Sequence, residues 1–357
     1  MSSNSVRVVV CDDSAVVRGM TTRALESHSD IEVVGSATNG QILLNLLPKT
    51  EVDVVVLDVE MPVLDGLTTL KQLQQLYPHI NVIMSSSLTR SGASTAIKAL
   101  TLGASSCVGK PEGASPAETV EILQRELLPL ILELGLTKQR TQTPIKKNTL
   151  PNETRPSAQP KALVIGSSTG GPQALSSVFA GLQAPFPLPI LIAQHMPPVF
   201  TKMLGEQLQR DTGHQCNEAQ EGEVIQPGKV YIAPGGYHLE VRKDPKTRIV
   251  TAHLNEGPKQ HSCRPSVNPL FQSASQVWGE NLLALMLTGM GEDGIEGTGM
   301  IREKRGFVIA QNEATSVVWG MPGAVVNAGL ANQVLPLKDI AVNLNQYCHS
   351  IKSPALV

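Results

Sequence analysis

The sequence lacks the features that mark three other classes of protein. Lysine and arginine total 29 against 31 acidic residues, whereas a protein that binds nucleic acid needs a basic surface to displace counterions. The five cysteines are odd in number and form no CxxC pair, which argues against a disulfide framework and a zinc site. No apolar run approaches the roughly 20 residues that cross a bilayer, and no leader-like segment opens the chain. We therefore expect a cytoplasmic protein with reduced thiols, no nucleic-acid partner and no direct membrane insertion.

The length and the hydrophobic content predict two globular domains. The chain has 357 residues, and one domain usually takes about 100 to 200 residues. Hydrophobic residues make up 41% of the chain, which is enough apolar material to form two buried cores.

The first part of the chain alternates short apolar runs with amphipathic stretches, which is typical of a βα repeat. Apolar runs of this length without polar alternation suit parallel strands that are buried on both faces. We expect strands near Val6–Val10, Ile31–Val34, Val54–Leu57, Val82–Met84 and Cys107. With a last helix from Pro116 to about Leu134, the pattern predicts a doubly wound (βα)5 domain over residues 1–135.

A polar, proline-broken segment follows and separates the two domains. Residues 136–160 contain too few large apolar side chains to offset the entropy of ordering, so we expect a flexible linker. The βα pattern then returns, which predicts a second doubly wound, mostly parallel α/β domain over residues 161–357. Its expected strands are Ala162–Ile165, Ile190–Ala193, Val230–Ile232, His238–Val241, Ile249–His253, Leu282–Leu287 and Phe307–Ala310.

Five polar residues follow successive strands of the first predicted domain. Asp12 and Asp13 follow the first strand, Asp58 the third, Ser86 the fourth and Lys110 the fifth. Each alone has an ordinary structural role, but ligands bind at the carboxyl ends of parallel strands, so five in this order indicate one site. Three gathered carboxylates imply a cation, and all-oxygen ligation with open positions favours Mg²⁺. Asp58 is then suited to attack a phosphoryl group whose oxygens Lys110 and Ser86 would contact.

This first domain resembles the response-regulator receiver family over roughly residues 5–135. The motifs are Cys11-Asp12-Asp13, then Leu57-Asp58-Val59-Glu60-Met61-Pro62 leading to Asp65-Gly66, and Lys110-Pro111. The resemblance implies that Asp58 is the phosphoacceptor and that a chemotaxis histidine kinase is the phosphodonor. It further implies Mg²⁺ ligation by Asp12, Asp13, Asp58 and the Glu60 carbonyl, and phosphate contacts from Ser86 and Lys110. Cys107 departs from the family, because many receivers carry there an aromatic residue that rotates on phosphorylation; we expect a small core residue.

Three loops at predicted strand ends of the second domain each carry a residue suited to ester hydrolysis. Ser168 lies in Ile165-Gly166-Ser167-Ser168-Thr169-Gly170-Gly171-Pro172, a turn whose N–H groups and helix N-terminus suit an anion. His195 ends the following strand, and Asp293 lies in Thr288-Gly289-Met290-Gly291-Glu292-Asp293-Gly294. A serine nucleophile, a histidine base and an orienting aspartate must meet in space, and loops at one edge of a parallel sheet permit this.

The second domain resembles the chemotaxis protein-glutamate methylesterases over about residues 161–349. Supporting stretches are Ile232-Ala233-Pro234-Gly235-Gly236, Arg264-Pro265-Ser266-Val267 and Gln311-Asn312-Glu313-Ala314-Thr315-Ser316-Val317-Val318-Trp319-Gly320-Met321-Pro322. The resemblance implies that Ser168 is the nucleophile, His195 the general base and acid, and Asp293 the residue that orients the histidine. It places Thr169 and Met290 at the pocket, near backbone donors for an oxyanion. Asn268 stands where we expect an aspartate in many family members, which affects a secondary polar contact and not the triad.

The two resemblances together imply a phosphorylation-activated protein-glutamate methylesterase that serves sensory adaptation. Its substrates would be glutamyl methyl esters, and glutamines for deamidation, on methyl-accepting chemotaxis receptors. We expect Mg²⁺ in the receiver domain and no cofactor for hydrolysis. We hypothesise that the unphosphorylated receiver packs over the Ser168 site and that phosphorylation of Asp58 weakens this contact, since a linker permits docking and release.

Other functions compete with this interpretation. A non-catalytic receiver adaptor would keep phosphorylation but show no ester hydrolysis. A nucleotide-binding second domain would use Gly166–Gly171 as a phosphate loop, although the spacing matches neither G-x-G-x-x-G nor the lysine-bearing P-loop. A DNA-binding output is disfavoured by the charge balance and by the α/β pattern.

Overall fold

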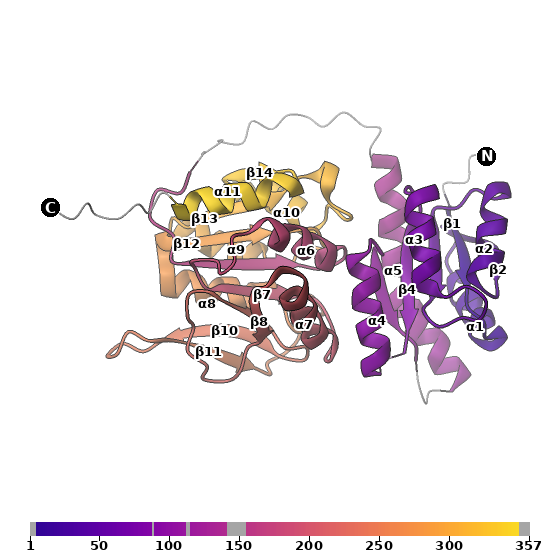
Figure 1. Ribbon diagram of the computed structural model, residues 1–357, viewed down its shortest axis with the longest axis horizontal. Coiled ribbons are helices and arrows are strands. Elements are labelled where there is room, and N and C mark those ends of the chain that lie inside the picture. Colours follow the sequence, from indigo (N-terminus) through magenta and orange to yellow (C-terminus); the bar gives the residue numbers. More distant parts are fainter. Residues whose placement is uncertain (1–4, 88, 112–114, 141–154, 350–357) are drawn as a thin grey trace. The chain divides into compact units, whose positions relative to one another are not determined.

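The chain forms two compact units, Met1–Ile145 and Lys146–Val357, in a computed structural model that describes residues 5–87, 89–111, 115–140 and 155–349. Each unit is built on a parallel sheet with helices (Figure 1). The predicted fold class, two α/β domains with parallel sheets, is confirmed. Residues 141–154 of the expected linker lie outside the described residues. In the parts of the chain just given, every helix lacks the length or the apolar character needed to traverse a bilayer.

The first unit contains five parallel strands in the order β2-β1-β3-β4-β5. They are β1 (Val6–Cys11), β2 (Ile31–Ala37), β3 (Val54–Asp58), β4 (Asn81–Ser86) and β5 (Ser106–Gly109). The helices are α1 (Ala15–Leu25), α2 (Gly40–Leu46), α3 (Gly66–Leu76), α4 (Arg90–Thr101) and α5 (Pro116–Arg140), with a 3-10 turn at Leu47–Lys49. All of β3 is buried, because helices cover both faces of the sheet.

Two local features explain where these helices begin and end. Polar side chains accept a backbone N–H at the start of α1 to α4, namely those of Ser14, Asn39, Asp65 and Thr89. Helix α5 starts at Pro116, as expected, but runs beyond Leu134 to Arg140. The polar residues after Leu134 read as linker in the sequence, yet lysine, glutamine and arginine are also strong helix formers.

The second unit contains seven parallel strands in the order β14-β13-β12-β6-β7-β9-β8, and an antiparallel hairpin of β10 and β11. The strands are β6 (Ala162–Ser167), β7 (Ile190–Gln194), β8 (Gln215–Glu218), β9 (Lys229–Ile232), β10 (His238–Lys243), β11 (Val250–Asn255), β12 (Leu282–Met286), β13 (Phe307–Gln311) and β14 (Gln333–Leu335). The strands β8 and β14 were not predicted from the sequence. Both are short edge strands, so neither needs the continuous apolar run that marks a central strand.

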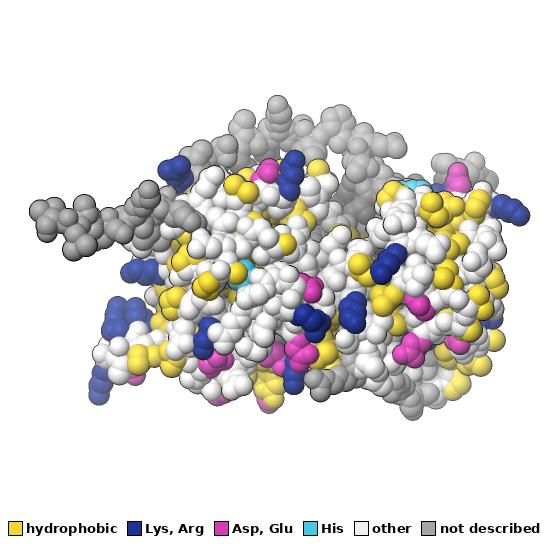
Figure 2. Space-filling model, viewed as in Figure 1, with side chains coloured by type: hydrophobic (Ala, Val, Ile, Leu, Met, Phe, Trp, Pro, Cys, Tyr) yellow, Lys and Arg dark blue, Asp and Glu magenta, His cyan; other side chains and the backbone are white. Residues whose placement is uncertain are grey.

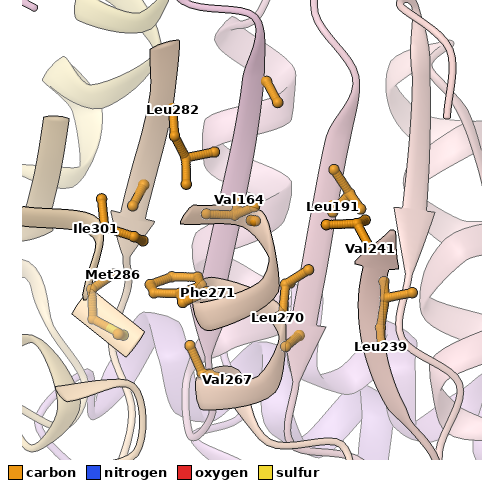
Figure 3. Packing of buried hydrophobic residues seen from close by; sticks show 14 of the residues in the cluster. Val164, Leu191, Leu239, Val241, Val267, Leu270, Phe271, Leu282, Met286 and Ile301 are labelled. Atoms are coloured by element: carbon orange, nitrogen blue, oxygen red, sulfur yellow. The ribbon is translucent and has the colours of Figure 1, made fainter. Parts of the chain in front are cut away.

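The helices of the second unit pack in two groups. They are α6 (Gly171–Gly181), α7 (Phe200–Thr212), α8 (Val267–Trp278), α9 (Ile295–Glu303), α10 (Met321–Asn327) and α11 (Leu337–His349), with 3-10 turns at Gly279–Asn281 and Glu313–Thr315. Helix α6 contacts α7 and α11, whereas α8 contacts α9 and β10. Figure 3 shows Leu270 and Phe271 of α8 directed at the strands that carry Val164 and Leu191. Burial of this cluster holds the N-terminus of α8 against the sheet.

The strand order reverses at β6, which pairs with β7 on one side and with β12 on the other. In open α/β sheets a ligand crevice forms at such a reversal, outside the carboxyl ends of the strands. The loops that follow β6, β7 and β12 carry Ser168, His195 and Asp293. The first unit has the same arrangement at β1, which lies between β2 and β3.

The surface carries charges of both signs. On the face drawn in Figure 2, lysine and arginine side chains stand singly or in small groups among acidic and neutral ones. This distribution agrees with the formal net charge of -2.

Candidate functional sites

An acidic cluster lies at the carboxyl edge of the first sheet. Asp12, Asp13 and Asp58 each offer an oxygen, and these oxygens lie within 4.8 Å of one another. Asp12 and Asp58 are buried, and Asp13 is exposed. The Lys110 Nζ lies 2.9 Å from Asp12 Oδ2 and 2.8 Å from Asp58 Oδ1. The structure therefore brings together four of the residues that the sequence placed at this edge.

The electrostatics of this cluster fit a divalent cation. Burial, helped by the charge of Asp12, raises the pKa of Asp58 even though Lys110 opposes it. Burial would lower the pKa of Lys110, but the two carboxylates outweigh burial and raise it. Within the described chain, the buried Asp58 Oδ2 has no hydrogen-bond partner. Lys110 thus contacts two of the three carboxylates, and oxygen ligands with an unpartnered atom suit Mg²⁺.

The remaining predicted residues of the first site lie around Asp58. The Ser86 side chain is buried at the end of β4, and its hydroxyl donates to the Ser87 carbonyl at 3.3 Å. The Glu60 N–H donates to Asp58 Oδ1 at 3.4 Å. Cys107 is half-buried in β5, and burial raises the pKa of its thiol to about 12. A thiol with that pKa stays protonated at neutral pH, which does not suit a redox sensor.

Ser168 sits on a sharp turn between β6 and α6. Gly170 has φ +77° at the N-cap of α6, and a methyl group there would lie 2.6 Å from Val317 Cγ2, so glycine is required. The Ser168 side chain is half-buried, and within the described parts of the chain its hydroxyl makes no hydrogen bond to His195 or to another residue. The spacing Gly166-x-Ser168-x-Gly170 between a strand and a helix is that of a nucleophile elbow. The same spacing is present in the sequence and is a more specific signal for a nucleophile than the glycines of the turn alone.

His195 and Asp293 form a buried pair beside this turn. His195 Nε2 lies 2.6 Å from Asp293 Oδ2, and the side chains are 11% and 1% exposed. Burial would lower the pKa of His195, but its hydrogen bonds to Asp293 and Cys263 outweigh burial and raise the pKa above its ordinary value. Because Nε2 faces Asp293, Nδ1 is the ring nitrogen that can accept a proton from a nucleophile.

The N-terminus of α8 holds the Asp293 carboxylate. Ser266 Oγ donates to Oδ1 at 2.7 Å, Val267 N donates to Oδ2 at 2.7 Å, and Asn268 N donates to Oδ1 at 3.3 Å. Burial would raise the pKa of Asp293, but His195 and these donors outweigh burial and lower it. A carboxylate at a helix N-terminus is stabilised by the free N–H groups and the helix dipole. Asp293 is thus fixed as an anion that faces His195.

Gln194 ties the serine and histidine loops together, a role that the sequence analysis missed. Its Nε2 donates to the carbonyl oxygens of Ser168 at 2.9 Å and His195 at 3.3 Å. Its Oε1 accepts from Ser167 Oγ at 2.6 Å. Gln194 is the last residue of β7 and is 2% exposed, and a glutamine at a buried strand end was the available signal.

Cys263 is a second residue that the sequence did not point to. Its thiol lies near the His195 ring and helps to raise the pKa of that histidine. Cys263 lies in a tight turn, in which it exchanges two backbone hydrogen bonds with Gln260 at 2.8 and 3.1 Å. This turn leads through Arg264 and Pro265 to Ser266, so one segment contacts both members of the His195–Asp293 pair.

Thr169 and Met290 occupy the loops that flank Ser168. Thr169 is 8% exposed, and its carbonyl accepts from Thr288 Oγ1 at 2.9 Å. Ser168 N donates to the Thr288 carbonyl at 3.0 Å, which joins the serine turn to the loop that carries half-buried Met290. In the described chain, the N–H groups of Thr169 and Met290 make no hydrogen bond. Free N–H groups beside a nucleophile are suited to bind an oxyanion.

Comparison with known proteins identifies relatives of both units. The family description "CheB methylesterase" matches residues 163–344, and "Response regulator receiver domain" matches residues 8–123. A relative from Caulobacter vibrioides, named protein-glutamate methylesterase/protein-glutamine glutaminase 2, is 44% identical over 349 residues and covers 97% of this chain and 100% of its own. A relative from Rhodospirillum centenum, with the same name but "of group 2 operon", is 41% identical over 368 residues and covers 95% and 93%. The Thermotoga maritima CheB methylesterase catalytic domain matches with a TM-score of 0.51 and 39% identity, over 53% of this chain and 99% of that one.

Proposed function

Since this chain belongs to the CheB methylesterase family and carries a response-regulator receiver domain, we propose that it is a phosphorylation-activated protein-glutamate methylesterase. It hydrolyses glutamyl methyl esters, and deamidates glutamines, on methyl-accepting chemotaxis receptors. The observation that carries this proposal is the buried His195–Asp293 pair at the strand reversal, where His195 N donates to the Ser167 carbonyl of the turn that carries Ser168.

In the proposed reaction, Ser168 Oγ attacks the ester carbonyl and His195 Nδ1 takes the serine proton. The carbonyl oxygen becomes an oxyanion, which the free N–H groups of Thr169 and Met290 are suited to bind. His195 then gives the proton to the leaving methoxide, and methanol departs. Water hydrolyses the acyl-enzyme by the same steps and releases a free glutamate. A glutamine side chain follows the same course with ammonia as the leaving group.

Asp293 supports this chemistry through its charge. His195 becomes an imidazolium each time it takes a proton, and a buried positive charge is unstable without a partner. The Asp293 anion lies 2.6 Å away and fixes the proton on Nε2, so Nδ1 stays directed to the nucleophile. The raised pKa of His195 has a consequence, since the histidine must be neutral to act as a base. Esterase activity should therefore rise with pH through the pKa of His195.

We propose Asp58 as the phosphoacceptor that controls this activity, with a chemotaxis histidine kinase as phosphodonor. Asp12, Asp13, Asp58 and the Glu60 carbonyl would hold Mg²⁺, which neutralises the oxygens of the phosphoryl group when it is bound. Lys110 contacts two of these carboxylates already and, with Ser86, would hold the phosphoryl oxygens. Cys107 replaces the usual aromatic switch residue, so the signal must leave the site by another route.

The receiver is proposed to act by occluding the Ser168 site until Asp58 is phosphorylated. The support is the chain order, in which a regulatory unit precedes a catalytic one across a polar, proline-broken segment. The test is a variant that lacks residues 1–150. It should outpace the unphosphorylated full chain, and equal or lower activity would contradict occlusion.

The cytoplasm is the proposed location. All five cysteines are unpaired, and free thiols persist in a reducing compartment. The cytoplasmic helices of receptors would then be within reach.

Substitution of the proposed nucleophile tests the function itself. The full-length protein is given methylated receptor fragments, with and without an acyl phosphate donor and Mg²⁺, and methanol release is followed. Ser168→Ala should lower the rate about 10⁶-fold, because the step that forms the acyl-enzyme is lost. Ser177→Ala is the matched control, since Ser177 is an exposed serine of the following helix. Hydrolysis that survives Ser168→Ala would overturn the assignment, and phosphorylation without hydrolysis in the unsubstituted protein would favour the adaptor.

A further inference from the structure

Asn268 connects the loop of Asp293 to the start of helix α9. It is the second residue of α8 and is 2% exposed. Its backbone N–H donates to Asp293 Oδ1 at 3.3 Å, and its side-chain Oδ1 accepts from Gly297 N at 2.9 Å. Its side-chain Nδ2 donates to Glu296 Oε2. All the side-chain hydrogen-bonding atoms of a buried amide thus point at one neighbouring segment.

We propose that Asn268 and Glu296 form a positioning pair that holds the Asp293 loop, and that the pair requires a neutral amide at position 268. The inference rests on the proposed function, because the role of Asp293 in orienting His195 belongs to that function. It concerns a residue that departs from the aspartate expected in many family members.

The hydrogen-bond pattern predicts that an aspartate would not replace Asn268 in this chain. The Asn268 Nδ2 is a donor, and Glu296 offers only acceptor oxygens when ionised. A carboxylate at position 268 could still accept from Gly297 N, but it would have no hydrogen to give to Glu296. The hydrogen bond between residues 268 and 296 would be lost, and the carboxylates of Asp at position 268 and of Glu296 would face each other.

The charges around the pair strengthen this argument. Asp293 is a buried anion, and Glu296 is a second carboxylate whose side chain is 58% exposed. The histidines that face them are His195, whose Nε2 is 2.6 Å from Asp293 Oδ2, and His261, whose Nε2 is 3.6 Å from Glu296 Oε2. A third carboxylate at position 268 would be buried between the two anions, where repulsion is weakly screened. The added negative charge would also favour the imidazolium form of His195 and so raise its pKa further. Asp293 and the Cys263 thiol already raise this pKa.

The test measures kcat/KM for methanol release between pH 6 and pH 10 in the phosphorylated full-length protein. Asn268→Asp should lower kcat/KM at pH 7 about tenfold and move the acid limb of the profile to higher pH. The double variant Asn268→Asp, Glu296→Gln should recover most of this loss, because the glutamine amide can donate to the new carboxylate. Glu296→Ala should lower kcat/KM by about threefold, whereas Glu296→Gln should not, since its carbonyl still accepts from Asn268. Glu303→Gln is the matched control on an exposed position of α9.

Two results would overturn the proposal. The first is an Asn268→Asp variant whose kcat/KM equals that of the unsubstituted protein and whose acid limb lies at the same pH. The second is a double variant whose kcat/KM is no higher than that of Asn268→Asp alone. If Asn268→Asp fails to fold, the comparison of Glu296→Ala with Glu296→Gln decides instead, and equal kcat/KM for the two would refute the pair. Proton NMR can follow the chemical shift of the proton in the His195–Asp293 hydrogen bond. This shift reports the effect of the Asn268–Glu296 pair on His195 without any measurement of catalysis. An inactive unsubstituted protein whose NMR signal still responds to Asn268→Asp would therefore contradict the proposed function and not the positioning pair.

Discussion

Replacement of Asp293 by asparagine probes the pair on which the proposed mechanism depends. The Asp293 carboxylate accepts from His195 Nε2 at 2.6 Å and from three donors at the start of α8. An asparagine keeps the shape and one acceptor oxygen, but an amide nitrogen cannot accept the His195 proton. The imidazole would then favour the tautomer with its proton on Nδ1, which is the nitrogen that must receive the serine proton.

The expected loss follows from this change of tautomer. In other Ser-His-Asp hydrolases the same substitution lowers kcat about 10⁴-fold, which corresponds to about 5.5 kcal/mol of transition-state stabilisation. We expect a loss of that order at pH 7 in methanol release from methylated receptor fragments. The pKa of His195 should fall as well, since the Asp293 charge helps to raise it, and the acid limb of the remaining activity should move to lower pH.

The control for this experiment lies at the adjacent position. Glu292→Gln makes the same change of charge on an exposed residue and should leave the rate within about twofold, as is usual for surface substitutions. An Asp293→Asn protein that folds normally and keeps activity within tenfold of the unsubstituted protein would refute the reasoning. Asp293 would then have no part in orienting His195.

Two further predictions concern other parts of the chain. Asp58→Asn should abolish incorporation of labelled phosphate from an acyl phosphate donor and with it any stimulation of methanol release; retained incorporation would show that another residue accepts the phosphoryl group. His214 is 1% exposed beside Phe179, and burial lowers its pKa below 6.5. As the pH falls, His214 is protonated in the unfolded chain before it is protonated in the folded protein. The free energy of unfolding is therefore unaffected by His214 above about pH 6.5, and it falls below that pH by at most about 1.4 kcal/mol per pH unit. Both tryptophans, Trp278 and Trp319, lie in the second unit, so their fluorescence in urea at pH 7 and pH 5 reads this loss, and His214→Phe should be less sensitive to acid than the unsubstituted protein.

The strand ends of both units were predictable because central parallel strands leave a plain signal. Continuous apolar runs such as those of β3 and β6 arise since both faces are buried, and the polar residues that follow them stand out. The edge strands β8 and β14 escaped prediction for the opposite reason. A partly exposed strand of three or four residues has no distinctive pattern, and its pairing is settled by the neighbouring strand.

The residues that support the second site could not be read from the sequence in the same way. Neither Gln194 nor Cys263 belongs to a sequence motif that points to His195. Their roles depend on which loops meet, as when the Gln194 side chain reaches two carbonyl groups. Asn268 was noticed only as a departure from a family pattern, and its partner Glu296 was not anticipated.

The fold class, the order of the two units and the candidate residues Asp58, Ser168, His195 and Asp293 could be predicted from the sequence. These predictions rest on local properties, namely hydrophobic period, turn residues and motif spacing. Such properties depend only on residues that lie close together in the chain. Two features are visible only in the folded protein: the N-terminus of α8 holds Asp293, and the neutral Asn268 is hydrogen-bonded to two carboxylates. Distances and burial set hydrogen bonding and pKa values, and both arise when segments far apart in the chain pack around the strand reversal at β6.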